Sequence, residues 1–142
     1  MIDFIRQIAP IAEAHGVFLA IHPDDPPISL LGLPRIVSTA KDVKILLDAY
    51  PSPHNGLTMC VGSYASRVDN EVEKLVQEFA TKINFVHLRN VRKVGDDSFV
   101  ESDHIDGDVD MFSVLSTLLH EQDRRKKIGV RHEGKSKIEI GK

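Results

Sequence analysis

The chain has 142 residues, of which 42% are hydrophobic and 27% charged, and its formal net charge is −3. This length suits one domain, so we expect residues 1–142 to form a single folded unit. The net charge and the lack of a basic stripe argue against nucleic-acid binding. No apolar run approaches the ~20 residues of a membrane span. A lone cysteine without a signal-peptide pattern predicts a cytoplasmic protein.

The first part of the chain predicts two helices separated by a strand and a long loop. Apolar residues recur with a helical period over residues 2–15. The continuous apolar run at 17–21 predicts a strand covered on both faces, as in a parallel sheet. A proline-containing loop follows to about Thr39, and Ser38 or Thr39 can cap a second helix over residues 40–49.

The middle of the chain repeats this order. A short strand is expected at 57–60 and a loop at 61–63. Residues 69–81 carry apolar side chains on one face of a helix. A third strand is expected at 83–88. Strands separated by helices of this length predict an α/β fold with a parallel sheet.

The last part of the chain predicts one loop, one helix and a tail. A charged loop is expected around residues 95–97, followed by a helix over 109–125 that Asp106 or Asp108 would cap. Residues 127–142 form a basic tail with weak patterning, to which we assign no structure.

Each predicted strand ends on a residue that can bind a metal ion: His22, Cys60 and His87. In a parallel sheet these strand ends meet at one edge, so the three side chains can converge. Imidazole and thiolate ligands suit borderline cations better than magnesium or calcium. Each of these residues, taken singly, is more often a packed or solvated side chain than a ligand, and only their shared position favours a metal site.

Several polar residues near these strand ends are candidates for substrate contacts. Arg35 lies in the first long loop, and Arg89 and Asn90 follow the third strand. An arginine near a metal can hold a substrate carboxylate in a two-pronged contact, and a solvated surface arginine is the alternative. His104 is either a general acid or base or a surface histidine.

Five motifs in one order resemble the mannonate dehydratase family across about residues 2–126. They are HPDDPP at 22–27, GLPRIVS at 32–38, NGLTMCVGS at 55–63, FVHLRN at 85–90 and ESDHIDGDVDM at 101–111. The resemblance implies part of a (β/α)8 TIM-type barrel of the xylose-isomerase-like group. It also implies a carbon–oxygen lyase that dehydrates D-mannonate to 2-keto-3-deoxy-D-gluconate in hexuronate catabolism.

The same resemblance implies a cofactor and a set of ligands. The cofactor would be Mn²⁺ or Fe²⁺, held by His22, Cys60 and His87, with Arg89 as a candidate for the substrate carboxylate. The partner would be a small sugar acid, with no nucleic acid or membrane involved.

The chain also departs from the family pattern. The family's chains are much longer, and roughly the second half of the barrel is expected here. The family's final Arg-Pro-Asp-His-Gly run is not present, and only residues 130–134 resemble it, which makes Glu133 a candidate extra ligand. Val100 stands where family members commonly have histidine.

Two alternatives stay open. A partial barrel leaves strand edges and apolar surface uncovered, so the chain could be a non-catalytic fragment that self-associates, and a homo-oligomer is expected. A sugar isomerase of the same barrel group is the other alternative, and turnover of aldoses in place of mannonate would distinguish it.

Overall fold

A computed structural model describes residues 1–95 and 98–128 of the chain. Its parallel sheet has the strand order β1-β2-β3 and consists of β1 (Leu19–Ile21), β2 (Asn55–Cys60) and β3 (Ile83–His87). The helices are α1 (Ile2–Ala14), α2 (Ala40–Ala49), α3 (Val61–Ala65), α4 (Val72–Phe79), the 3₁₀ turn η1 (Ala80–Lys82) and α5 (Met111–Lys127). The alternation of helices with parallel strands confirms the predicted α/β class.

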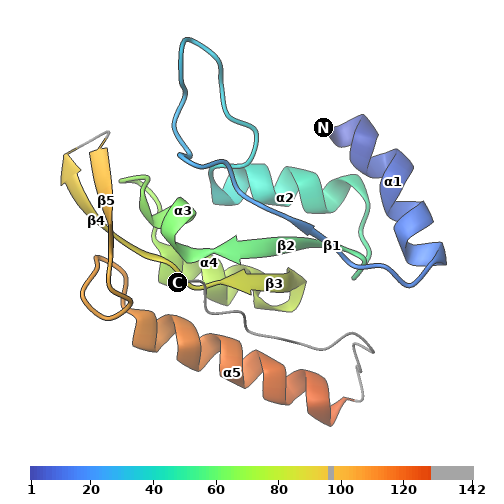
Figure 1. The fold of residues 1–142 in the computed structure, drawn as a ribbon. Coiled ribbons are helices and arrows are strands. Elements are labelled where there is room, and N and C mark those ends of the chain that lie inside the picture. The colour runs from blue at the N-terminus through green and yellow to red at the C-terminus, as the bar shows by residue number, and fades with distance from the viewer. Residues whose placement is uncertain (96–97, 129–142) are drawn as a thin grey trace.

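The core lies between this sheet and the helices. In Figure 1, α1 and α2 lie toward the β1 edge of the sheet and α5 lies beyond the β3 edge, and α1 contacts α2 while α4 contacts α5. Leu57 and Met59 of β2 point into the core and are almost fully buried. The side chains that alternate with them, Thr58 and Cys60, therefore face the other side of the sheet. In the described part of the chain, no helix is long and apolar enough to cross a membrane.

The structure corrects three local predictions. Residues expected to form a loop after β2 instead form the short helix α3. The residues on either side of the expected charged loop form an antiparallel hairpin that was not predicted, β4 (Asn90–Gly95) with β5 (Ser98–Ser102), while residues 96–97 lie outside the described part of the chain. Asp110, rather than Asp106 or Asp108, caps α5, because its carboxylate accepts hydrogen bonds from the N–H groups of Phe112 and Ser113.

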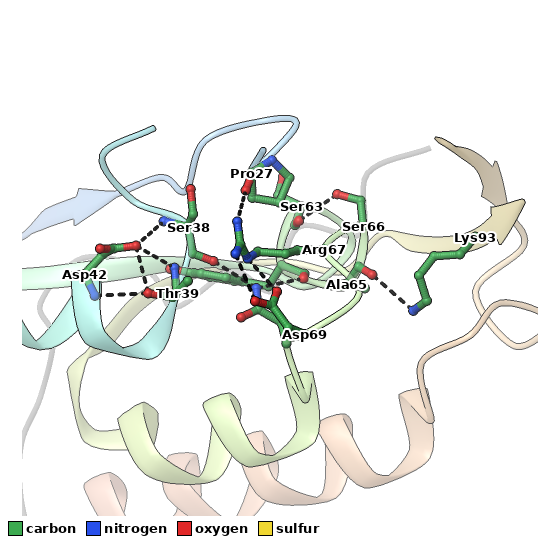
Figure 2. Close-up of polar contacts among 12 residues, drawn as sticks. Pro27, Ser38, Thr39, Asp42, Ser63, Ala65, Ser66, Arg67, Asp69 and Lys93 are labelled. Carbon is green, nitrogen blue, oxygen red and sulfur yellow. Dashed lines mark hydrogen bonds and ion pairs between the residues drawn. The ribbon is translucent and has the colours of Figure 1, made fainter. Parts of the chain in front are cut away.

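The long loop of residues 22–39 leaves the carboxyl end of β1 and is held to the body of the protein. Figure 2 shows Arg67, just after α3, between Pro27 and Asp69. Its Nη1 donates to the Pro27 carbonyl at 3.1 Å, and it pairs with the Asp69 carboxylate. The amide of Asn70 donates to the Ser38 carbonyl at 2.8 Å. The loop that follows His22 is therefore fixed at both of its ends.

Thr39 caps α2 through a capping box. Its hydroxyl accepts from the Asp42 N–H, and the Asp42 carboxylate accepts from the Thr39 N–H at 2.9 Å. We expect Thr39→Ala to lower the free energy of unfolding by about 1 kcal/mol, because one N–H at the helix start loses its partner. Urea denaturation measures this loss. Thr39→Ser keeps the acceptor and should stay close to wild type, and equal losses in both variants would contradict the cap.

Candidate metal centre

Three potential ligands meet where the parallel strands end. His22 follows β1, Cys60 ends β2 and His87 ends β3, and Cys60 and His87 are opposite each other in the sheet. One ligand atom from each of the three lies within 4.8 Å of the others. Cys60 Sγ is 3.3 Å from His87 Nδ1, and the two imidazole rings are 6.4 Å apart between centroids. The convergence predicted from the strand ends is present.

A bulge in β3 decides which side chain lies opposite Cys60. The pairing of β2 with β3 shifts by one residue after Leu57, so Asn84 is an extra residue between two paired ones. An extra residue moves every later side chain of the strand by one position. Without it, Val86 would occupy the place of His87 and an apolar side chain would face the thiol.

Gly56 makes room for this bulge. A Cβ atom at Gly56 would lie 2.2 Å from Asn84 Nδ2 and 2.6 Å from the Lys82 carbonyl oxygen. The Asn84 amide uses that space to donate to the carbonyls of Leu19 at 2.8 Å and Pro53 at 3.1 Å. The bulge is thus held to β1 and to the loop before β2, and the register at His87 is held with it.

Two of the ligands are prepared for an ion by their surroundings. His22 Nδ1 lies 2.6 Å from the Pro23 carbonyl oxygen, which can only accept, so Nδ1 carries the proton and Nε2 keeps its lone pair. Burial, followed by the nearby charge of Arg89, lowers the pKa of His87. His87 is therefore neutral at neutral pH, which is the state that binds a metal.

The donor set and its spacing fit a divalent transition-metal ion. Atoms bound to one such ion at ~2.0–2.3 Å lie about 3 to 4.5 Å from one another, close to the spacing found here. Two imidazoles and a thiol also exclude the hard ions magnesium and calcium as the preferred occupants. Three protein ligands leave coordination positions for a substrate or water, which is typical of catalytic sites.

A cavity of about 490 Å³ opens beside His87. It lies between the end of β3 and the β4–β5 hairpin, which projects beyond the carboxyl ends of the strands in Figure 1. Its lining residues are His87, Leu88, Arg89, Asn90, Glu101, Ser102, Asp103 and His104. A metal ligand and several titratable groups therefore share one cavity, the usual form of a small-molecule site.

Comparison with known proteins gives the family. A model of the family "D-mannonate dehydratase (UxuA)" matches residues 1–139. The chain belongs to the D-mannonate dehydratase family. It is 55% identical over 129 residues to the mannonate dehydratase of Saccharophagus degradans, and 50% identical over 131 residues to mannonate dehydratase 2 of Agrobacterium fabrum. These matches cover 91% and 92% of this chain but 32% and 33% of the relatives, so the chain spans about a third of their length.

Solved structures agree with this assignment. The mannonate dehydratase of Streptococcus suis serotype 2 superposes with a TM-score of 0.81 at 45% identity, over 84% of this chain and 35% of that one. A xylose isomerase domain protein of Planctomyces limnophilus superposes with a TM-score of 0.66 at 14% identity, over 84% of this chain and 40% of the other, and shows the fold alone. The chain thus has the fold of part of a barrel, as the resemblance implied.

In this member of the D-mannonate dehydratase family, Arg89 already holds a carboxylate of its own chain. Its Nη1 and Nη2 donate to the two Asp25 oxygens at 2.7 Å and 3.1 Å. The pair raises the pKa of Arg89 and lowers that of Asp25. The role of Arg89 toward a substrate carboxylate stays a prediction, and a substrate would have to share this guanidinium with Asp25.

The side chain of Asn90 makes its hydrogen bonds within the protein, and its substrate contact stays a prediction. The side chain is 1% exposed, and its amide nitrogen donates to the His104 carbonyl at 2.8 Å and the Val109 carbonyl at 3.1 Å. Its oxygen accepts from the N–H groups of Val91 and Val109. Because both N–H groups and both acceptor positions of the amide are used inside the protein, Asn90 links the hairpin to the loop before α5.

Other predicted residues have separate outcomes. Arg35 donates from Nε to the Ile28 carbonyl at 3.1 Å within its own loop and does not line the described cavity, so its substrate contact remains a prediction. Glu133 and the tail from residue 129 onward lie outside the described residues. The prediction for Glu133 as a ligand is therefore unchanged.

His104 lies on the cavity wall with a defined orientation. Its Nε2 is 2.8 Å from the Leu88 carbonyl oxygen, which requires a proton on Nε2. The neutral ring then has its lone pair on Nδ1, so Nδ1 is the atom that could take up a proton. This geometry suits the predicted acid–base role.

Sequence reasoning missed the hairpin residues Glu101, Ser102 and Asp103, which line the cavity. The signal for β5 was short, because residues 98–102 mix apolar and polar side chains and two charged residues precede them. An antiparallel strand with one exposed face has this kind of alternation. The pairing with β4 therefore only becomes evident in three dimensions.

Asp108 fastens this hairpin to the loop before α5, and it does so through its charge. Its carboxylate accepts from the Lys93 N–H at 2.8 Å, which lowers the pKa of Asp108. A lowered folded pKa adds stability above the unfolded value of about 3.9, and that stability is lost as the pH falls through the folded value. We expect Asp108→Asn to have a lower urea midpoint than wild type at pH 7, and the gap to close below about pH 4. A gap that is independent of pH would contradict this.

Proposed function

We propose that this chain carries the metal-binding part of a D-mannonate dehydratase, which removes water from D-mannonate to give 2-keto-3-deoxy-D-gluconate. The observation that carries the proposal is the convergence of His22, Cys60 and His87 at the strand ends of a chain from this family. Parallel-barrel enzymes place their chemistry at this same end of the strands. The adjoining cavity supplies room for a sugar acid.

The three converging residues would hold a divalent ion, which we take to be Mn²⁺ or Fe²⁺. When bound, such an ion acts as a Lewis acid toward substrate oxygens and stabilises negative charge that develops when a proton leaves the carbon next to the carboxylate. The protein's part is to present two neutral imidazoles and a thiolate from three rigid strand ends.

His104 is our candidate for proton transfer. Its Nε2 is committed to Leu88, so Nδ1 would take or give the proton from the cavity wall. Arg89 is the arginine among the described residues that line the cavity, and its guanidinium would attract the substrate carboxylate. Its existing pair with Asp25 makes the orientation of the guanidinium fixed before substrate arrives.

The decisive experiment measures metal and product together. The chain is loaded with Mn²⁺ or Fe²⁺, dialysed and analysed for metal, and then incubated with D-mannonate while 2-keto-3-deoxy sugar acid is measured. We expect about one ion per chain in wild type and none in His87→Ala, with any product formation following the metal. Equal metal content in wild type and His87→Ala would count against the proposal.

Self-association is the second candidate, and an exposed apolar surface favours it. Phe85 faces the same side of the sheet as Cys60 and is 38% exposed. Within the described residues, β1 and β3 are the edges of the parallel sheet. Unpaired edges and apolar surface favour pairing with another chain. Sedimentation velocity should show an oligomer, and a clean monomer over a range of concentrations would exclude it.

A further inference from the structure

Building on the proposed metal centre, we infer that Ser63, Arg89 and Asp25 form a positioning chain that fixes the thiol of Cys60 and the loop of His22 relative to each other. None of these three residues would bind the ion. Groups that hold metal ligands in place from behind are a general feature of metal sites, and they set both affinity and geometry.

Ser63 is the first link, and it acts on the sulfur. Its side chain is fully buried, and its hydroxyl donates to Cys60 Sγ at 3.0 Å. A hydroxyl has one proton, so the Ser63 oxygen is then available only as an acceptor. Arg89 Nη2 occupies that acceptor at 3.4 Å. The contact with Arg89 therefore leaves the Ser63 proton available for Cys60 Sγ.

Arg89 is the second link, and it joins two parts of the chain. Besides contacting Ser63, its guanidinium grips both oxygens of Asp25 in a planar, two-pronged pair. Its stem lies over Gly62, where a Cβ atom would be 2.4 Å from Arg89 Nε. The arginine side chain is 16% exposed, so it has little freedom to turn elsewhere.

Asp25 is the third link, and it belongs to the loop that carries His22. The neighbouring Asp24 accepts from the N–H groups of Ile36 and Val37 at 2.7 Å each, and Arg67 holds Pro27. Because the loop is fixed on either side of Asp25, the ion pair of Arg89 with Asp25 sets the distance between the His22 loop and β3. His22 lies three residues away in the same segment.

The short helix that carries Ser63 is itself held in place. Figure 2 shows Ser66 Oγ donating to the Ser63 carbonyl, at 2.8 Å, and Lys93 reaching the Ala65 carbonyl, at 3.2 Å. Ser63 and Asp25, the two ends of the positioning chain, thus both lie in segments that other hydrogen bonds hold in place. A rigid connection of this kind can hold two ligands at a fixed separation before the ion binds.

The test uses Co²⁺ as the probe, without substrate, on wild type and on Ser63→Ala, Asp25→Asn and the double variant. We expect each single substitution to weaken Co²⁺ binding by about 10- to 100-fold and to shift the thiolate-to-cobalt absorption band. Because the three residues act together, the double variant should lose about as much Co²⁺ affinity as one single variant. This loss is smaller than the product of the two single fold-losses.

Two matched controls separate this from general damage. Ser52→Ala removes another buried hydroxyl, at the opposite end of β2, and Asp123→Asn removes another ion-paired carboxylate, on α5. Both should bind Co²⁺ like wild type, and urea midpoints confirm that all variants fold. Wild-type affinity in the folded single variants, or fully additive losses in the double variant, would overturn the inference and leave the metal centre standing. Failure of wild type to bind Co²⁺ through a thiolate would overturn the proposed function as well.

Discussion

Cys60→Ser should weaken binding of a divalent ion by more than about 100-fold. This exceeds the 10- to 100-fold loss typical of residues that only hydrogen-bond to a ligand. The thiolate is a ligand on the strand at the centre of the sheet, and its sulfur lies 3.3 Å from His87 Nδ1. A serine hydroxyl does not lose its proton at neutral pH and is a poor ligand for a borderline ion. Equilibrium dialysis with Co²⁺ measures the affinity, and the thiolate-to-cobalt absorption band should vanish.

Substitution of His87 should give a Co²⁺ spectrum that differs from that of Cys60→Ser. His87→Ala should weaken binding comparably while any residual Co²⁺ complex keeps its sulfur band, because Cys60 is intact. His120→Ala, which removes an exposed imidazole on α5, serves as the control and should match wild type. Wild-type Co²⁺ affinity in Cys60→Ser or in His87→Ala would show that the metal centre is assigned to the wrong residues.

Asn90→Ala should lower the free energy of unfolding by about 3 kcal/mol or more. The substitution leaves the carbonyls of His104 and Val109 and the Val109 N–H without their partner, in a place that water does not reach. A buried polar group that loses its partner costs about 1–3 kcal/mol. Urea denaturation at neutral pH measures the loss.

Two further asparagine substitutions make this prediction specific. Asn90→Asp keeps the acceptor but cannot donate to the two carbonyls, so it should also be strongly destabilised. Asn70 bridges two carbonyls as well, those of Ser38 and Tyr64, but it is only half-buried, so Asn70→Ala should cost less. A stable Asn90→Ala protein with weakened substrate binding would contradict this structural role and favour the predicted contact of Asn90 with substrate.

The convergence of His22, Cys60 and His87 was predictable because their positions follow from local patterns. The apolar runs before His22, Cys60 and His87 define strands, and parallel strands bring their ends to one edge. The same reasoning placed helices at α1, α2, α4 and α5 to within a few residues, because each of them has a one-sided apolar period.

The contacts of Asn90 and Arg89 within the protein could not be predicted in this way. Asn90 looked like a substrate contact since it follows a strand end, and only the packing of the hairpin against the loop before α5 shows that its amide is used up. Arg89 also looked free to bind a substrate, but its carboxylate partner, Asp25, lies 64 residues away in the chain. Partners so distant leave no trace in a local pattern.

Sequence by itself therefore determined the class of fold and the three residues that can ligate a metal, because strand, helix and strand-end positions depend on side-chain periodicity over a few residues. The tertiary structure alone decided the register that puts His87 opposite Cys60, through a bulge that Gly56 accommodates. It also decided the hairpin that walls the cavity and the links from Cys60 to the His22 loop. These features depend on which distant segments come into contact, and that is settled only when the whole core packs.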